Sequence, residues 1–280
     1  MSKIPTLILN NGVEMPQLGF GVWQVADDEA TAAVAAALQA GYRSIDTAAI
    51  YENETGTGKA LAASGIARDE LFVTTKLWNS SSETWTRENV LREFDASLEK
   101  LGLDYVDLYL IHWPRAMRDD YLTIFRSFAE IAESGRAKAI GVSNFEPAQL
   151  ERLIAETPVV PAVNQVELHP YFAQSELRAF HARHGIATEA WSPLGQGRGL
   201  LDDPTLARIA AKHGRTAAQV VLRWHLQLGN VVIPKSVTPS RIRENFDVFG
   251  FELDADDLAA ISGLDNGNRL GPDPAEFDWS

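Results

Sequence analysis

The sequence predicts a single α/β domain spanning residues 1–280, a (β/α)8 TIM barrel with an N-terminal β-hairpin and an irregular C-terminal tail. Strand and helix patterns alternate along the chain, many predicted strands are nearly continuous apolar runs, and glycines follow the predicted helices. Such apolar strands are typical of parallel sheets covered on both faces. A doubly wound sheet is the main alternative, but it needs fewer strands and usually a second domain, and no linker or repeat marks a boundary.

The elements are expected in a regular order. A hairpin opens the chain, because Thr6–Leu9 and Val13–Met15 flank Asn10-Asn11-Gly12, whose Asn and Gly accept the positive φ of tight turns. The predicted barrel strands are Leu18–Gly21, Ser44–Asp46, Leu71–Lys76, Tyr105–His112, Ala137–Ser143, Val159–Val166, Ile186–Trp191 and Val231–Pro234. The predicted helices are Asp28–Ala40, Thr57–Ser64, Thr86–Leu101, Tyr121–Ser134, Pro147–Glu156, Gln174–His184, Thr216–Leu228 and Pro239–Phe246. The tail, Asn266–Ser280, is expected to cover one end of the barrel.

Helix ends carry their own signals. Left-handed caps are expected at the glycines that follow predicted helices: Gly41, Gly65, Gly102, Gly135, Gly185 and Gly229. Thr216 with Gln219 resembles a capping box, and Thr238 is expected to cap the helix that begins at Pro239.

Composition excludes several classes of function. The net charge of −13 disfavours nucleic acids and anionic membranes as partners, and the absence of cysteine excludes disulfides and thiolate chemistry. No signal peptide and no run of membrane-spanning length is found. We therefore expect a cytoplasmic protein with a small-molecule substrate, and no membrane or nucleic-acid partner.

Four ionisable residues lie at or just beyond predicted strand ends: Asp46, Tyr51, Lys76 and His112. In a barrel these strand ends converge on the catalytic face. A nearby ammonium is expected to lower the pKa of a tyrosine so that it can protonate a carbonyl oxygen, while a carboxylate holds the lysine and a histidine orients the carbonyl. No side chain supplies a hydride, so a cofactor is implied. Taken singly, these residues could instead form a buried ion pair, rim packing and a core histidine.

A second cluster follows the last predicted strand. Lys235, Ser236, Thr238 and Arg241 surround the start of a helix, where unpaired N–H groups and the dipole favour an anion. We expect a phosphate site here, although a solvated charged face is the plainer alternative. The chain has no convincing GxGxxG, so a dinucleotide would bind without that device.

Other polar and aromatic residues also end strands. Ser143, Asn144 and Gln165 could pair with a carboxamide, and Trp191 could stack on a flat ring; strand-end capping and rim packing are the alternatives. Trp23, Trp78 and Trp113, with His112, could line a substrate pocket. No histidine and carboxylate spacing indicates a metal site, and His169 and His184 are interpreted as structural.

Five motifs resemble the aldo-keto reductase superfamily in order and spacing: GYRSIDTAAIYENE, then Lys76, IHWP, GRAKAIGVSNF and IPKSVTPSRIREN. The resemblance covers nearly the whole chain and is strongest to the bacterial branch that includes 2,5-diketo-D-gluconate reductases. It implies a (β/α)8 barrel, usually monomeric, that reduces aldehydes and ketones with NADPH. By resemblance Tyr51 is the proton donor, Lys76 and Asp46 tune it, and His112 positions the carbonyl. The implied NADP(H) contacts are Ser143, Asn144, Gln165, Trp191, Ser192, Leu194, Lys235, Ser236, Val237, Thr238, Arg241, Glu244 and Asn245. An alternative function is a regulatory barrel that binds NADP(H) with little turnover.

Overall fold

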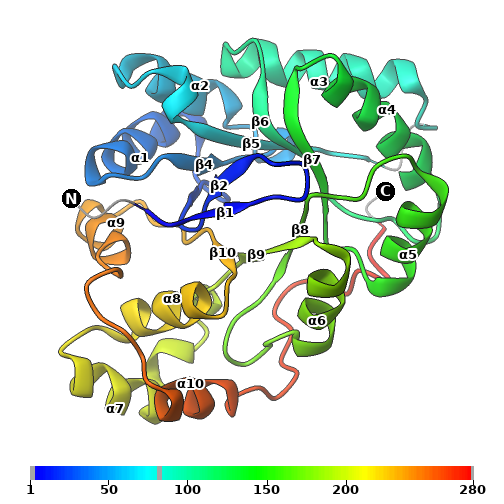
Figure 1. Ribbon diagram of the computed structural model, residues 1–280. Coiled ribbons are helices and arrows are strands. Elements are labelled where there is room, and N and C mark those ends of the chain that lie inside the picture. The colour runs from blue at the N-terminus through cyan, green and yellow to red at the C-terminus, as the bar shows by residue number, and fades with distance from the viewer. Residues whose placement is uncertain (1–3, 81–83, 279–280) are drawn as a thin grey trace.

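The computed structural model describes residues 4–80 and 84–278. Within these ranges, eight parallel strands form one sheet in which each strand pairs with its neighbours in sequence, from β3 to β10 (Figure 1). A parallel bridge between Leu18 and Val232 joins the two edges of this sheet, and Gly19 N donates to Val232 O at 2.9 Å. The sheet therefore closes on itself, which confirms the predicted barrel.

The strands of the barrel are β3 (Phe20–Gly21), β4 (Ser44–Asp46), β5 (Phe72–Leu77), β6 (Val106–Ile111), β7 (Ala137–Ser143), β8 (Val163–Glu167), β9 (Ala187–Trp191) and β10 (Val231–Val232). The α-helices are α1 (Asp27–Ala40), α2 (Glu54–Ala63), α3 (Arg87–Leu101), α4 (Tyr121–Glu133), α5 (Pro147–Glu156), α6 (Ser175–His184), α7 (Pro204–His213), α8 (Ala217–Gln227), α9 (Pro239–Phe246) and α10 (Ala255–Ser262). None of these described helices is long and apolar enough to cross a membrane.

An antiparallel hairpin closes one end of the barrel. Its strands, β1 (Thr6–Ile8) and β2 (Glu14–Pro16), lie across the middle of the ring of strands in Figure 1. The side-chain amide of Asn10 donates to Pro161 O at 3.1 Å, and that of Asn11 donates to Lys138 O at 2.9 Å. Leu9 and Met15 are buried in a cluster with side chains inside the barrel, so the hairpin fills the N-terminal end of the strands.

Local sequence explains most element boundaries. All six glycines expected at helix ends have positive φ, between 65° and 115°. Thr216 forms the expected capping box with Gln219. Thr238 was expected to cap α9 as well, but its side chain makes no capping hydrogen bond, although Pro239 does begin the helix.

The structure differs from the sequence prediction in one strand boundary and in two additional helices. The sixth strand of the barrel, β8, starts at Val163 rather than Val159, because Pro161 has no N–H to give to the ladder. The sequence analysis also missed α7 and α10, although Asp203 caps the first ahead of Pro204 and Asp254 caps the second. The expected tail is irregular from residue 266 to 278, and its last two residues lie outside the described part of the chain.

Two glycines let three helices pack closely behind the site. A Cβ at Gly56 would lie 2.1 Å from Asp27 O, and one at Gly58 would lie 2.2 Å from Leu101 O. Both glycines lie in α2, whose backbone therefore touches the first turn of α1 and the end of α3. The Gly56-Thr-Gly58 pattern serves helix packing, and α2 in turn fixes the loop that precedes it.

Candidate active site

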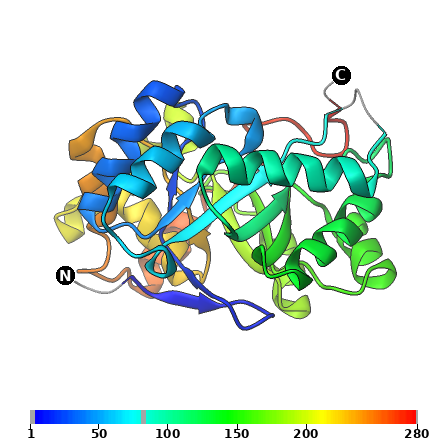
Figure 2. The same ribbon diagram turned by 90° about the horizontal axis from the view of Figure 1, so that it is seen from above.

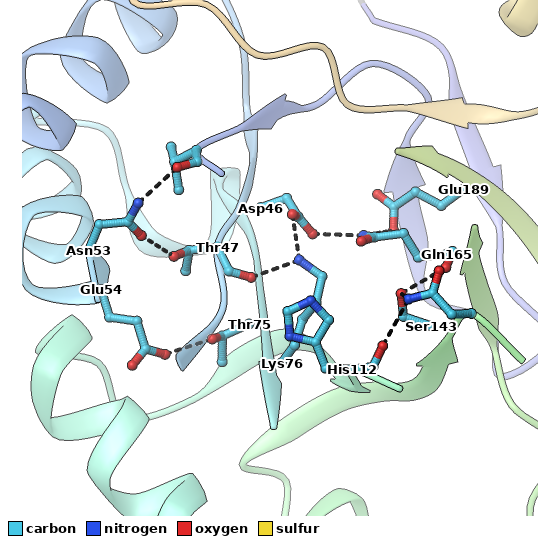
Figure 3. Close-up of polar contacts among 12 residues, drawn as sticks. Asp46, Thr47, Asn53, Glu54, Thr75, Lys76, His112, Ser143, Gln165 and Glu189 are labelled. Atoms are coloured by element: carbon cyan, nitrogen blue, oxygen red, sulfur yellow. Dashed lines mark hydrogen bonds and ion pairs between the residues drawn. The ribbon is translucent and has the colours of Figure 1, made fainter. Parts of the chain in front are cut away.

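A buried ion pair lies at the centre of the site. Lys76 on β5 is fully buried, and its Nζ donates to Asp46 Oδ1 at 2.6 Å and to Thr47 O at 2.9 Å (Figure 3). Neighbouring parallel strands bring them together, because Asp46 ends β4 and its Cα partner on β5 is Thr74, two residues before Lys76 on the same face. Burial alone would lower the pKa of Lys76, but the Asp46 carboxylate raises it above its usual value, so the ammonium stays charged.

Tyr51 lies over this pair. It ends a 3₁₀ turn, η1 (Ala49–Tyr51), and Lys76 Nζ is 5.0 Å from the centroid of its ring. The turn is held by Asn53, which accepts a hydrogen bond from Thr47 Oγ1 at 2.7 Å and donates to Val22 O at 2.8 Å (Figure 3). These contacts fix the phenol relative to the strand that carries Asp46.

The pKa of Tyr51 differs from the sequence-based expectation. Burial of the hydroxyl raises this pKa, and it outweighs the lowering by the Lys76 charge; Asp46 and Glu189 raise it further. The expectation that the pKa of Tyr51 is lowered overall is therefore wrong. The charge of Lys76 does lower this pKa, as expected, but by less than burial raises it. The phenol is protonated at neutral pH, which is the form that can donate a proton.

His112 follows β6 and faces Tyr51. The two rings are 5.5 Å apart at 76°, and the Trp78 ring lies 5.3 Å away on a T-shaped contact. Burial, and then the charge of Lys76, hold the pKa of His112 well below its ordinary value. The imidazole is therefore neutral at pH 7 and carries one N–H, which can be donated to an oxygen atom.

Gln165 connects the Lys76–Asp46 pair to the next strands. Its Nε2 donates to Asp46 Oδ2 and to Glu189 Oε2, both at 2.8 Å. Ser143, on the neighbouring strand β7, donates its hydroxyl to the backbone oxygen of Gln165 at 2.8 Å. In Figure 3, Asp46, Gln165 and Glu189 lie in a row across the barrel interior.

Asn144 links the same region to His112 and Trp191. Its Nδ2 donates to His112 O at 3.0 Å and to Ser143 Oγ at 3.1 Å, while Trp191 Nε1 donates to its Oδ1 at 2.8 Å. The residues predicted to hold a nicotinamide are thus joined by hydrogen bonds to those predicted to act on the carbonyl. The half-buried Trp191 ring keeps an exposed portion on which a planar ring could stack.

The predicted anion site lies around the start of α9. Lys235 and Arg241 are exposed, and neither makes an ion pair with any carboxylate in the described ranges. Ser236 Oγ accepts the Thr238 N–H at 3.1 Å and shapes the turn. Unpaired cations at a helix start in a chain of net charge −13 fit a phosphate, because the dipole alone would repel them.

The remaining predicted cofactor residues border these two groups. Glu244 accepts the hydroxyl of Thr216 at 2.9 Å, Asn245 is buried beside it, and Val237 is exposed. Ser192 Oγ accepts from Gln196 Nε2 at 2.7 Å, and Leu194 packs on the core. Ser192 and Leu194 lead into a loop that the sequence left undefined. Its residues Gly195, Gln196, Gly197 and Gly199 have positive φ, with Arg198 at φ −93° between the last two.

The C-terminal tail crosses the mouth of the barrel. Glu167, at the end of β8, accepts the N–H groups of Leu270 at 2.6 Å and Gly271 at 2.8 Å, as well as His169 Nε2 at 2.9 Å. These hydrogen bonds lower the pKa of Glu167 in spite of its burial, so the carboxylate holds the tail in its ionised form. A Cβ at Gly271 would lie 2.5 Å from Trp191 Cη2, so the tail backbone presses against that ring.

Further along the tail, an aromatic contact meets the predicted pocket wall. Phe277 packs on Trp113 with ring centroids 4.1 Å apart, and Asp278 lies 3.5 Å from the buried guanidinium of Arg115. Trp23, also predicted for this wall, is 43% exposed. In Figure 2 the red tail and the blue hairpin lie at opposite ends of the barrel.

Sequence reasoning missed two buried carboxyl groups of this face, Glu189 and Glu167. Both belong to strands that otherwise consist of apolar and neutral polar residues. A carboxyl in a predicted buried strand is rarely found without a partner, so this was the available signal. What it could not show is the partner, since Glu189 meets Gln165 and Glu167 meets the tail about one hundred residues further on.

A closed (β/α)8 barrel whose strand ends gather a tyrosine, a lysine–aspartate pair and a neutral histidine has the geometry of a carbonyl-reducing barrel enzyme. Residues 17–266 match the Aldo/keto reductase family, and the chain belongs to this family. It is accordingly an NADP-dependent oxidoreductase, as the sequence predicted.

Several named proteins are similar to this chain over nearly its full length. An aldo-keto reductase of Mycolicibacterium smegmatis is 56% identical over 276 residues, covering 99% of both chains. Methylglyoxal reductase DkgA of Escherichia coli K12 is 54% identical over 275 residues, covering 98% of both chains. A solved structure of a Gox0644 variant in complex with NADPH is 48% identical, with a TM-score of 0.94 over 99% of this chain and all of that one.

Proposed function

We propose that this protein reduces aldehydes or ketones to alcohols, with Tyr51 as the proton donor. The nicotinamide, when bound, supplies the hydride to the carbonyl carbon. The observation that carries the proposal is the fully buried Lys76–Asp46 pair, whose ammonium lies 5.0 Å from the centroid of the Tyr51 ring.

The side chains divide the work on the carbonyl oxygen. The neutral His112 ring donates a hydrogen bond to this oxygen and orients it. The phenol of Tyr51 transfers its proton to the same oxygen as negative charge develops there. Lys76 then stabilises the phenolate that remains, and Asp46 holds the ammonium charged and in place.

The cofactor is held at two places in this proposal. Ser143, Asn144 and Gln165 contact the carboxamide of the nicotinamide, and Trp191 packs on its ring. Lys235, Ser236, Thr238 and Arg241 bind the 2′-phosphate, with charge-assisted hydrogen bonds at the start of α9. This second group is what favours NADP(H) over NAD(H).

For the substrate we propose small 2-oxoaldehydes of the methylglyoxal type. The support is the 54% identity to a relative named methylglyoxal reductase DkgA, together with a small cavity lined by Trp78, Trp113 and Phe277. A panel of methylglyoxal, sugar-derived ketones and aromatic aldehydes, followed by NADPH absorbance, ranks these classes by kcat/KM.

The test is Tyr51→Phe, which removes the acid and keeps the ring. We expect kcat for methylglyoxal reduction to fall about 10²- to 10⁴-fold, as for loss of a general acid, with NADPH affinity nearly unchanged. Tyr105→Phe is the matched control, because that phenol contacts Lys138 at 3.3 Å on the outside of the barrel. Wild-type kcat in the Tyr51→Phe protein would disprove the proposed role.

A further inference from the structure

The proposed mechanism leaves one buried ionisable group unused, Glu189. It lies on β9 inside the barrel, is fully buried, and is the Cα partner of Gln165 on β8. The packing of β9 inside the barrel does not require a carboxyl group at this position, and burying a carboxyl group without a partner is unfavourable. Its contact with Gln165 therefore calls for a functional explanation.

The hydrogen bonds of the Gln165 amide define what this side chain can offer. An amide nitrogen carries two N–H groups. Here one is donated to Asp46 Oδ2 and the other to Glu189 Oε2, each at 2.8 Å. Both donors are thereby used, and only Oε1 of Gln165 remains to meet a ligand.

The two carboxyl groups do different parts of this work. The Asp46 carboxylate pairs with Lys76 at 2.6 Å and accepts from Gln165 Nε2, so the nitrogen end of the amide faces it. That single bond leaves the amide free to rotate about it. Glu189 takes the second N–H and so fixes the plane of the amide.

We propose that Glu189 is a positioning residue for the cofactor, which holds the Gln165 amide so that its oxygen accepts from the nicotinamide carboxamide. This inference rests on the proposed function and assigns a residue that acts only through Gln165. Glu189 itself is fully buried and accepts from the Gln165 amide, so it acts through that amide.

The surroundings of Glu189 suit a neutral acceptor. Burial, and then the charge of Asp46, raise its pKa to about 8, while Gln165 and Lys76 act in the opposite direction. At pH 7 the group is therefore a carboxylic acid whose carbonyl oxygen accepts from Gln165. A second negative charge beside Asp46 is avoided, and Lys76 keeps a single counter-ion.

The first experiment measures NADPH affinity at pH 7 by quenching of tryptophan fluorescence. Glu189→Leu removes the acceptor and should weaken binding about tenfold, the usual effect of leaving one buried donor unpaired. Glu189→Gln retains a carbonyl acceptor and should stay within about threefold of wild type. Glu54→Gln is the matched control: it is a buried carboxyl that contacts Thr75 rather than Gln165, and it should change nothing.

A double-mutant cycle separates positioning from general damage. In a Gln165→Ala background, Glu189→Leu should cause no further loss of NADPH affinity, because the group on which it acts is gone. Full affinity in Glu189→Leu, or an undiminished loss in the Gln165→Ala background, would overturn the proposal. Failure of the wild-type protein to bind NADPH would instead refute the proposed function.

If Glu189→Leu does not fold, an NMR measurement on the ligand-free wild-type protein still tests the proposed contact between Glu189 and Gln165. The side-chain amide protons of Gln165, observed by NMR with ¹⁵N-labelled glutamine, should shift as Glu189 ionises with a midpoint near 8. The neighbouring Lys76 and Tyr51 both have pKa values raised above their usual ones, so neither of them ionises in that range. The shift should be absent in Glu189→Gln, and amide protons that do not respond in wild type would contradict the proposed contact.

Discussion

The contact between the tail and Trp191 gives a sharp prediction for Gly271→Ala. A Cβ on this residue would lie 2.5 Å from Trp191 Cη2 and 3.0 Å from Glu167 Oε2. Carbon atoms pack at about 3.5–4.0 Å, so an overlap of about 1 Å must be relieved. The backbone of Gly271 is outside the left-handed region, so the cost is steric rather than conformational.

Neither side of the contact can yield freely. Moving the tail outward lengthens the bonds from Leu270 and Gly271 to the Glu167 carboxylate, which are 2.6 and 2.8 Å long. Swinging the ring breaks the 2.8 Å bond from Trp191 Nε1 to Asn144. Overpacking of this kind costs about 1–3 kcal/mol, and we expect the free energy of unfolding to fall by that amount.

The assays are urea unfolding and NADPH binding by fluorescence. Because Trp191 is proposed to pack on the nicotinamide, we expect NADPH affinity to fall about tenfold if half of the overlap is relieved by the ring, equivalent to about 1.4 kcal/mol. Gly263→Ala is the matched control: its φ is −71°, and a Cβ there would lie 3.3 Å from Ala259 O, against 2.5 Å from Trp191 at Gly271. A Gly271→Ala protein with wild-type stability and NADPH affinity would show that the tail does not press on the ring.

Two further predictions follow from charged groups. Arg241→Ala should weaken NADPH binding at least tenfold, because charge-assisted hydrogen bonds to the 2′-phosphate are lost, and it should leave NADH binding nearly unchanged. The control is Arg208→Ala, which removes an exposed arginine elsewhere on the surface. Equal losses of affinity for both nucleotides would refute the 2′-phosphate site. Burial lowers the pKa of His181 and of His225 to about 3. Below pH 6.5 these histidines bind protons in the unfolded chain but not in the folded one, so the free energy of unfolding decreases as the pH decreases. Each histidine contributes up to about 1.4 kcal/mol per pH unit to this dependence. His181→Asn should therefore reduce the slope of the free energy of unfolding against pH between pH 6 and 5. An unchanged slope, measured by urea unfolding at each pH, would contradict this.

The grouping of the predicted site residues at one end of the barrel was predictable, because barrel topology brings distant strand ends together. Asp46, Lys76 and His112 could be placed at this end of the barrel because each lies at the end of an apolar run in the sequence. Their mutual contacts add only detail to that placement. The hairpin was predictable for a different reason, since the Asn-Asn-Gly turn is a local signal.

What the sequence could not give depends on long-range distances and on competing energies. The bridge from Gln165 to both Asp46 and Glu189 joins residues 119 and 24 positions apart, and no periodicity encodes it. The sign of the Tyr51 pKa shift depends on how far burial exceeds the lysine's effect, which requires atomic positions. The course of the tail over Glu167 is set by backbone N–H groups, which every residue except proline possesses.

The hairpin that fills one end of the barrel has a practical consequence for engineering. Ile4 and the strand after it lie on the closed side, whereas Asp278 lies beside Arg115 at the mouth. An affinity tag or a surface linker joined at the start of the chain would face away from incoming substrate. The same attachment beyond Asp278 would compete with the Arg115 contact and crowd the mouth of the barrel, where we propose that the carbonyl substrate enters.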